Sequence, residues 1–166
     1  MPTVIYKLGN DVSTDVIYPG RYMATVLPSE TPQFAFADDA AFNARLKAKQ
    51  IPPGSVVVGG RNFGCGSSRE QAVSCLKGHE LVIVARGFAR IFFQNAINLG
   101  LSVVICPDIE AAEGDELELA GDRILDKTTN RTYRREPMPK SRQAIIDAGG
   151  LIPYTRQRLQ AAQTPH

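Results

Sequence analysis

The stretch GRNFGCGSSREQA, residues 60–72, combines glycines with two adjacent serines and an arginine. Backbone N–H groups in a glycine-rich turn, together with the positive end of a following helix, form a place where an anion can bind. Ser67 and Ser68 bring hydroxyl groups to this turn, and Arg69 brings a guanidinium that can hold a carboxylate through two hydrogen bonds. The types and spacing of these residues predict an anion site with serine hydroxyls beside it.

Two known phosphate-binding motifs do not fit this stretch. A P-loop requires Gly-Lys followed by Ser or Thr, which is absent here. Gly64-Cys65-Gly66 is not followed by the third glycine of a dinucleotide-binding fingerprint. The sequence therefore argues against a nucleoside triphosphatase and against a Rossmann-type dehydrogenase.

Ser67 and Glu70 have the spacing of a capping box, which predicts that a helix begins in the serine stretch. Capping without any chemistry is the alternative interpretation of such a pair. Arg69 in the first turn of that helix would oppose the helix macrodipole at a cost of about 0.3–1 kcal/mol. This cost favours an anionic partner for Arg69, and a simple ion pair with Glu70 is the alternative.

The elements that must position this loop read as an α/β core. Residues 55–60, 80–85 and 102–107 are short β-branched runs without polar alternation, which is typical of strands covered on both faces. Helical patterns over residues 67–78 and 87–100 separate them. This order predicts parallel strands connected by helices.

The flanking segments complete one predicted domain. A strand over residues 3–8 and a loop over 13–25 precede a short amphipathic helix over 38–49. After Pro107 alternating apolar and polar residues predict an antiparallel hairpin or meander, and two helices close the chain. No repeat or linker divides the sequence, so we expect residues 1–166 to form a single domain.

Composition and charge limit the class of protein. A formal net charge of +2 is too small to favour nucleic acid or an anionic membrane surface as a partner. No apolar run approaches the roughly 20 residues of a membrane span, and the N-terminus lacks the pattern of a signal peptide, so we expect a cytoplasmic protein. Cys65, Cys75 and Cys106 suit neither a disulfide framework nor a metal knuckle, and we expect Cys75 and Cys106 to be buried.

Three separated blocks of the sequence resemble one known family. GGRNFGCGSSREQA, with ARGFARIFFQNAINLGL after it and DVSTDVIYPGRYM before it, is similar to the small subunits of 3-isopropylmalate dehydratase (isopropylmalate isomerase). These subunits correspond to the mobile swivel domain of aconitase. The resemblance implies an α/β fold of the aconitase-type swivelling β/β/α kind, with a mixed sheet and flanking helices.

The resemblance also implies roles for individual residues. Ser67 corresponds to the catalytic base, and Ser68 and Arg69 to groups that hold a substrate carboxylate. Asp15 matches an active-site aspartate of the family. Arg21 is a further candidate for carboxylate binding, with stabilisation of its loop as the alternative. The implied reaction removes water from an alkyl-substituted malate and adds it back, as in the isomerisation of 3-isopropylmalate and 2-isopropylmalate in leucine biosynthesis.

The specificity loop of the family corresponds to Tyr22, Met23, Ala24 and Thr25. Family members that bind a γ-carboxylate carry arginine where this chain has Ala24. Leaving a carboxylate unpaired there would cost about 1–3 kcal/mol or more, which argues against citrate and homocitrate. The resemblance therefore implies an apolar substituent, and a methyl-substituted malate of the 2,3-dimethylmalate or citraconate class is the alternative to isopropylmalate. A carboxylate-binding module without catalysis is the alternative to an enzyme.

The implied cofactor is a [4Fe-4S] cluster, one iron of which acts as Lewis acid on the leaving hydroxyl. In the family, three cysteines of a large subunit hold this cluster. Because the present chain lacks such a cysteine set, we expect it to bind no metal itself and to be active only with a large subunit. The expected ligand is a small dicarboxylate, and neither nucleic acid nor a membrane is expected as a partner.

Overall fold

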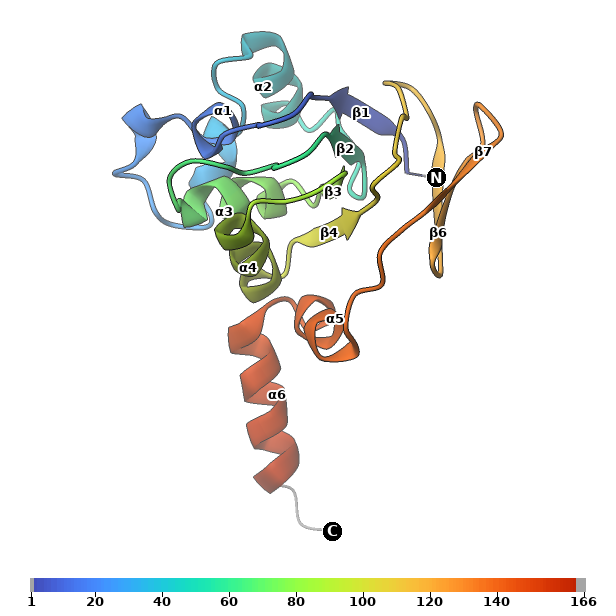
Figure 1. Cartoon of the computed structure of the whole chain (residues 1–166). Helices are drawn as coiled ribbons and strands as arrows, with labels where there is room; N and C mark the ends of the chain where they lie inside the picture. Colours follow the sequence, from blue (N-terminus) through green and yellow to red (C-terminus); the bar gives the residue numbers. More distant parts are fainter. Residues whose placement is uncertain (1, 164–166) are drawn as a thin grey trace.

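The computed structural model describes residues 2–163 and is built around a four-stranded parallel sheet (Figure 1). Across the sheet its strands are β1 (Val4–Lys7), β2 (Val56–Gly59), β3 (Val82–Ala85) and β4 (Ser102–Ile105). Every residue of β2 is buried, as the continuous apolar run predicts. The predicted parallel core is confirmed.

A second sheet of three antiparallel strands follows the parallel one in the chain. Its strands are β5 (Leu117–Ala120), β6 (Arg123–Asp126) and β7 (Arg131–Arg134). Its turns fall at Gly121 and Asn130, both of which have a positive φ. Backbone bonds from Val4 N to Asp115 O and from Leu117 N to Pro2 O tie this sheet to the N-terminal segment. The parallel and antiparallel strands thus lie in two sheets.

Side chains on the two faces of the parallel sheet belong to two different cores, because successive residues of a strand point to opposite faces. Val57, Ile83 and Val103 lie in the core shared with the helices. Val56, Val58, Val84 and Val104 lie in the core shared with the antiparallel sheet. The molecule therefore has the predicted β/β/α order of layers, with the parallel sheet in the middle (Figure 1).

Helices form the third layer of the molecule. They are α2 (Ala40–Lys47), α3 (Glu70–Gly78), α4 (Arg90–Leu99) and α5 (Lys140–Asp147). The last helix, α6 (Leu151–Gln163), extends away from the body of the molecule (Figure 1). In the described part of the chain, no helix combines the length and the apolar character that crossing a membrane requires.

The prediction of a simple loop over residues 13–25 is wrong. This segment contains the short helix α1 (Thr14–Ile17) and a 3-10 turn (Gly20–Tyr22). Ser13 Oγ caps α1 by accepting a hydrogen bond from Val16 N at 3.2 Å. The hydroxyl of the buried Tyr18 then donates to the carbonyls of Tyr22 and Thr25, and this contact stabilises the turn.

A carboxylate pair is buried where β6 ends. Asp126 is fully buried, and its Oδ1 accepts hydrogen bonds from Thr128 N and Thr129 N. Its Oδ2 has no hydrogen-bond donor within residues 2–163. Burial and, next, the neighbouring Asp115 carboxyl raise the pKa of Asp126 above its ordinary value. The folded chain therefore binds the proton of Asp126 more tightly than the unfolded chain does.

The raised pKa of Asp126 makes stability depend on pH in a defined direction. The folded state binds the proton more tightly than the unfolded chain, so the stabilisation is complete below the unfolded pKa of about 4 and is lost as the pH rises through the folded pKa. Asp126→Asn keeps an oxygen acceptor and removes the buried charge. At about pH 7 we expect its Tm to exceed that of the parent by about 2–4 °C or more. At about pH 4 the difference should shrink.

Thermal unfolding at both pH values checks this expectation. Asp122→Asn, at an exposed turn of the same sheet, is the matched control and should shift the Tm little at either pH. A lower Tm for Asp126→Asn at both pH values would contradict a raised pKa of the buried Asp126.

Candidate functional site

The glycine-rich loop runs beside the segment that begins α1. Gly64 N donates to the carbonyl of Val12 at 2.7 Å, and Thr14 N donates to that of Cys65 at 2.8 Å. Ser13 and Cys65 form an isolated parallel β-bridge. Two segments far apart in the sequence are thus joined backbone to backbone, and together they form the floor of the candidate site.

Gly64 and Gly66 are required for this arrangement. Both have left-handed backbone conformations, with φ of +87° and +93°. A Cβ on Gly64 would overlap the side chain of Phe92 on α4. The absence of a side chain at Gly64 therefore lets α4 pack directly against the loop.

The predicted capping box of Ser67 and Glu70 is wrong. Helix α3 begins at Glu70 with Arg69 at the N-cap position, and no side chain caps it. The carbonyl of Ser67 instead accepts hydrogen bonds from Thr14 Oγ1 at 2.8 Å and from Arg69 N at 2.9 Å. These bonds hold Ser67 in a turn before the helix. Its hydroxyl is consequently exposed, with no hydrogen-bond partner in residues 2–163.

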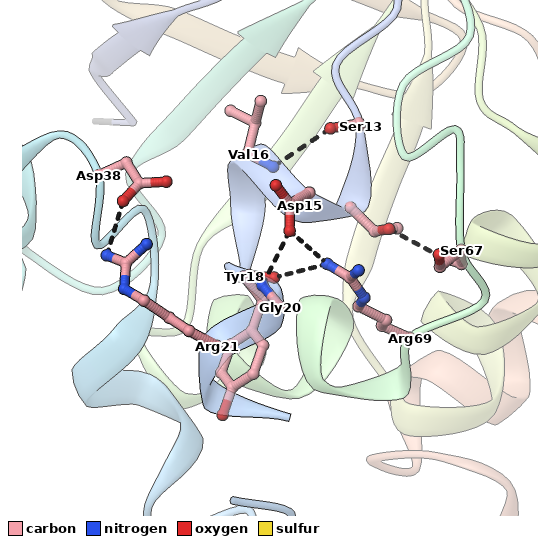
Figure 2. A network of polar contacts seen from close by, with 10 residues as sticks. Ser13, Asp15, Val16, Tyr18, Gly20, Arg21, Asp38, Ser67 and Arg69 are labelled. Atoms are coloured by element: carbon pink, nitrogen blue, oxygen red, sulfur yellow. Dashed lines mark hydrogen bonds and ion pairs between the residues drawn. The ribbon is translucent and has the colours of Figure 1, made fainter. Parts of the chain in front are cut away.

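Arg69 is paired, although not with Glu70. Its Nη1 donates to Asp15 Oδ1 at 2.8 Å and to the carbonyl of Tyr18 at 3.2 Å (Figure 2). Asp15 Oδ1 also accepts a hydrogen bond from Gly20 N at 2.8 Å. The hydrogen bond from Arg69 and then that from Gly20 hold the pKa of Asp15 below its ordinary value. The sequence prediction that Asp15 and Arg69 belong to one site is consistent with this contact.

The contacts of Arg69 leave half of its guanidinium available. The Arg69 side chain is 16% exposed and that of Asp15 is 62% exposed. Nε and Nη2 of Arg69 donate to no acceptor within the described residues. These two atoms form one edge of the planar group and match the two oxygens of a carboxylate. Asp15 thus fixes the guanidinium while leaving that edge free for a ligand.

A hollow of about 530 Å³ opens in front of the two serines. This volume lies in the range of small-molecule sites. The residues that line it are Thr14, Gly64, Gly66, Ser67, Ser68, Arg69, Ala89, Arg90, Ile91, Phe92 and Asn95. The structure therefore brings the predicted Ser67, Ser68 and Arg69 together around one space.

Two polar residues of this wall were not singled out by the sequence. Thr14 lies on α1 and Asn95 on α4, and each reaches the hollow only through the tertiary packing of its helix. Thr14 directly precedes Asp15 in a block shared with the resembling family, which is the one signal that could have identified it. Asn95 lies within ARGFARIFFQNAINLGL, another of the resembling blocks, but nothing in that mostly apolar helix distinguishes it as a site residue.

Arg21 does not line the hollow in front of the serines. Its Nη2 forms an ion pair with Asp38 Oδ1 at 2.6 Å, and its guanidinium lies over the Tyr22 ring at 4.7 Å. Figure 2 shows the side chain directed to Asp38, on the other side of α1 from Ser67. In this structure Arg21 stabilises its own loop.

The predicted specificity loop rests on α3. Tyr22 stacks on Phe34 with ring centroids 4.0 Å apart, and Gln71 Nε2 donates to the carbonyl of Met23 at 3.3 Å. Met23 and Ala24 are exposed. A smaller hollow of about 330 Å³ follows this loop, lined by Val26, Pro28, Ser68, Glu70, Gln71, Ser74 and Leu99. Ser68 borders both hollows, and Val26, the residue after the specificity loop, lines the smaller one.

The cysteines of this chain do not fit an iron-sulfur cluster. Cys75 and Cys106 are buried, as predicted, and burial raises the pKa of the Cys106 thiol to about 11. Cys65 is half-buried in the loop. Within residues 2–163, no group of three or more His, Cys, Asp and Glu side chains could hold a metal ion. A four-iron cluster needs several converging thiolates, which these positions do not supply.

Comparisons with known proteins agree on one family. The family model described as the aconitase C-terminal domain matches residues 12–107. An isopropylmalate/citramalate isomerase small subunit from Methanocaldococcus jannaschii is 41% identical over 165 residues, which cover 96% of this chain and 95% of that protein. A 3-isopropylmalate dehydratase small subunit from Methanosarcina mazei is 43% identical over 157 residues, which cover 92% of this chain and 94% of that protein.

A solved structure is also similar over almost the whole chain. The crystal structure of a 3-isopropylmalate dehydratase from Methanocaldococcus jannaschii matches with a TM-score of 0.85 and 38% sequence identity. The match covers 98% of this chain and 98% of that one. The likeness therefore includes the antiparallel sheet and the closing helices as well as the loop.

The two glycines of the loop give a test of its geometry. We expect Gly64→Ala to lower the free energy of unfolding by about 2–5 kcal/mol, the sum of about 1–2 for a left-handed alanine and about 1–3 for the overlap with Phe92. Gly66→Ala is the matched control. Its nearest atoms would lie at 3.8 Å, so only the backbone cost of about 1–2 kcal/mol should appear. Urea unfolding measures both, and equal losses would contradict the described packing of α4.

Proposed function

The chain belongs to the aconitase C-terminal domain family, among proteins similar to 3-isopropylmalate dehydratase small subunits, and on this premise we propose that it is the small subunit of a hydro-lyase. The enzyme removes water from an alkyl-substituted malate and adds it back at the neighbouring carbon. The main candidate reaction is the isomerisation of 3-isopropylmalate and 2-isopropylmalate in leucine biosynthesis. We place this reaction in the cytoplasm and assign residues 1–166 to one domain.

One observation carries the assignment to this site. Ser67, whose hydroxyl has no partner in the described part of the chain, and Arg69, whose Nε and Nη2 are not used by Asp15 or Tyr18, line the same hollow. A malate derivative has a carboxylate and, on the adjacent carbon, the proton that the reaction removes. Arg69 would bind the carboxylate through two hydrogen bonds, and this would place the acidic proton near Ser67.

Ser67 would act as the base, with Ser68 as a second hydroxyl for the same carboxylate. A serine alkoxide is far too basic to persist unaided at neutral pH. A helix N-terminus contributes at most about 2 kcal/mol, and its effect falls off within the first turn. Because α3 begins at Glu70, Ser67 lies outside that turn and gains less. The charge of Arg69, loop N–H groups and exclusion of water by a partner must supply the rest.

The need for a partner follows from the same site. The relatives are named small subunits, which implies a larger subunit that binds to them. Membership of the aconitase family indicates an iron-sulfur enzyme. We assign the cluster to that large subunit because the described cysteines of this chain do not converge. When bound, the cluster would supply a Lewis acid to the hydroxyl that leaves.

The substituent of the substrate is assigned from the specificity loop. Ala24 offers neither a charge nor a hydrogen-bonding side chain and is exposed, and Val26, two residues later, lines the hollow that Ser68 borders. An apolar group on the malate fits this position better than a third carboxylate. Methyl-substituted malates are the second candidate substrate class, and the name of the relative from Methanocaldococcus jannaschii, which includes citramalate, favours keeping it.

Replacing the proposed base tests the function. In the complex reconstituted with the large subunit, we expect Ser67→Ala to lower kcat by about 10²–10⁴-fold with little change in KM, because only proton transfer is lost. The absorbance of the cluster should be unchanged. Ser141→Ala, an exposed serine on α5, is the control and should keep full activity. Parent-like turnover of Ser67→Ala would overturn the assignment of the base, and a complex that hydrates no alkyl-maleate at all would favour a binding module.

The specificity loop gives a second test. Ala24→Arg provides a cation for a γ-carboxylate, and we expect the ratio of kcat/KM for tricarboxylate over alkyl-malate substrates to rise by about 10–100-fold. Ala24→Gln adds similar length without charge and should lower activity on alkyl-malates without raising activity on tricarboxylates. An unchanged ratio in Ala24→Arg would mean that the loop over Tyr22–Thr25 does not contact the substituent.

A further inference from the structure

Thr14 has a buried hydroxyl that contacts the serine loop directly. The residue is the first of α1 and is 2% exposed. Its Oγ1 donates to the carbonyl of Ser67 at 2.8 Å. The hydroxyl does not cap its own helix, because Ser13 Oγ already accepts the bond from Val16 N. The side chain of Thr14 therefore serves the contact with the loop.

Thr14 contacts the loop on both sides of Gly66. Its backbone N donates to Cys65 O, and its Oγ1 donates to Ser67 O. Gly66 lies between these carbonyls and has the left-handed φ of +93°. Glycine has the widest choice of backbone conformations, so this is where the loop would otherwise vary most.

The second contact fixes the peptide group that follows Ser67. The Ser67 carbonyl accepts from both Thr14 Oγ1 and Arg69 N, so the plane of the Ser67–Ser68 peptide is held from two directions. Because the peptide is planar and trans, the N–H of Ser68 points away from Thr14. With the backbone held, the Ser67 hydroxyl keeps only the freedom of its side-chain rotamers.

We propose that Thr14 is a positioning residue for Ser67, whose hydrogen bond to the Ser67 carbonyl sets where the serine hydroxyl stands beside Arg69. This inference rests on the proposed function, in which Ser67 is the base. The next residue, Asp15, holds Arg69, so two consecutive residues of α1 fix the base and the carboxylate ligand relative to each other. The α1 turn thereby sets the distance between Ser67 and Arg69, on which proton abstraction depends.

The test compares variants in the complex reconstituted with the large subunit. Thr14→Val keeps the shape of the side chain and removes the hydroxyl. Since a displacement of about 1 Å can cost about 10²-fold in rate, we expect kcat to fall by about 10–100-fold with KM within about twofold. Thr14→Ser restores the donor and should recover most of the rate. Thr128→Val removes a threonine hydroxyl that accepts a bond from Glu116 N beside the antiparallel sheet, and it should leave kcat close to that of the parent.

A second readout does not depend on activity. Amide hydrogen exchange of the isolated chain should be faster at Arg69 in Thr14→Val. The Arg69 N–H donates to the Ser67 carbonyl, and this carbonyl is held less firmly once the Thr14 hydroxyl no longer donates to it. Exchange in β2 should be unchanged. Thr14→Ser and Thr128→Val should exchange like the parent at Arg69.

Defined results would overturn the inference. Parent-like kcat and exchange in Thr14→Val, an equal loss in Thr128→Val, or no rescue by Thr14→Ser would each do so. Ser67→Ala in the same panel separates the two proposals. If Ser67→Ala loses turnover while Thr14→Val keeps it, only the role of Thr14 fails. If Ser67→Ala keeps turnover, the proposed function fails, whatever the exchange at Arg69 shows.

Discussion

The site depends on the backbone pairing between the segment that begins α1 and the glycine-rich loop after β2. Bonds from Gly64 to Val12, from Thr14 to Cys65 and from Thr14 to Ser67 join the two segments. The Asp15–Arg69 ion pair extends the same junction, from the residue after Thr14 to the second residue after Ser67. Side chains from distant parts of the sequence are thus held by short main-chain contacts, which position groups more firmly than flexible side chains alone.

The residue patterns predicted the strands of both sheets because their signals are local. Continuous β-branched runs identified β2 and β3, and alternating residues identified the antiparallel sheet. The prediction of a capping box was wrong because a Ser-x-x-Glu spacing contains no information on the tertiary hydrogen bond from Thr14 to the Ser67 carbonyl. The ion-pair partner of Arg69 could not be predicted from the sequence either. Glu70 is its neighbour in the sequence, whereas Asp15 comes close only in the folded chain.

An incomplete site explains several features of the chain together. The serine hydroxyls are exposed, one edge of the Arg69 guanidinium is free, and the predicted specificity loop lies open beside them. Polar groups without a protein partner destabilise a closed site, where water cannot reach them. At an open surface water solvates them until a partner covers the surface. The proposed division of labour follows: this chain orients the carboxylate and holds the base, and a larger subunit closes the space and supplies the metal.

The structure of the complex with a bound substrate analogue tests most directly whether the half-site is built before the partner arrives. We predict that Ser67 Oγ lies within roughly 3.5 Å of the carbon that carries the acidic proton, with the carboxylate on Nε and Nη2 of Arg69. The contacts of Arg69 to Asp15 and of Thr14 to Ser67 should be those described for the chain alone. A carboxylate that displaces Asp15 from Arg69, or a substrate beyond the reach of Ser67, would contradict this account.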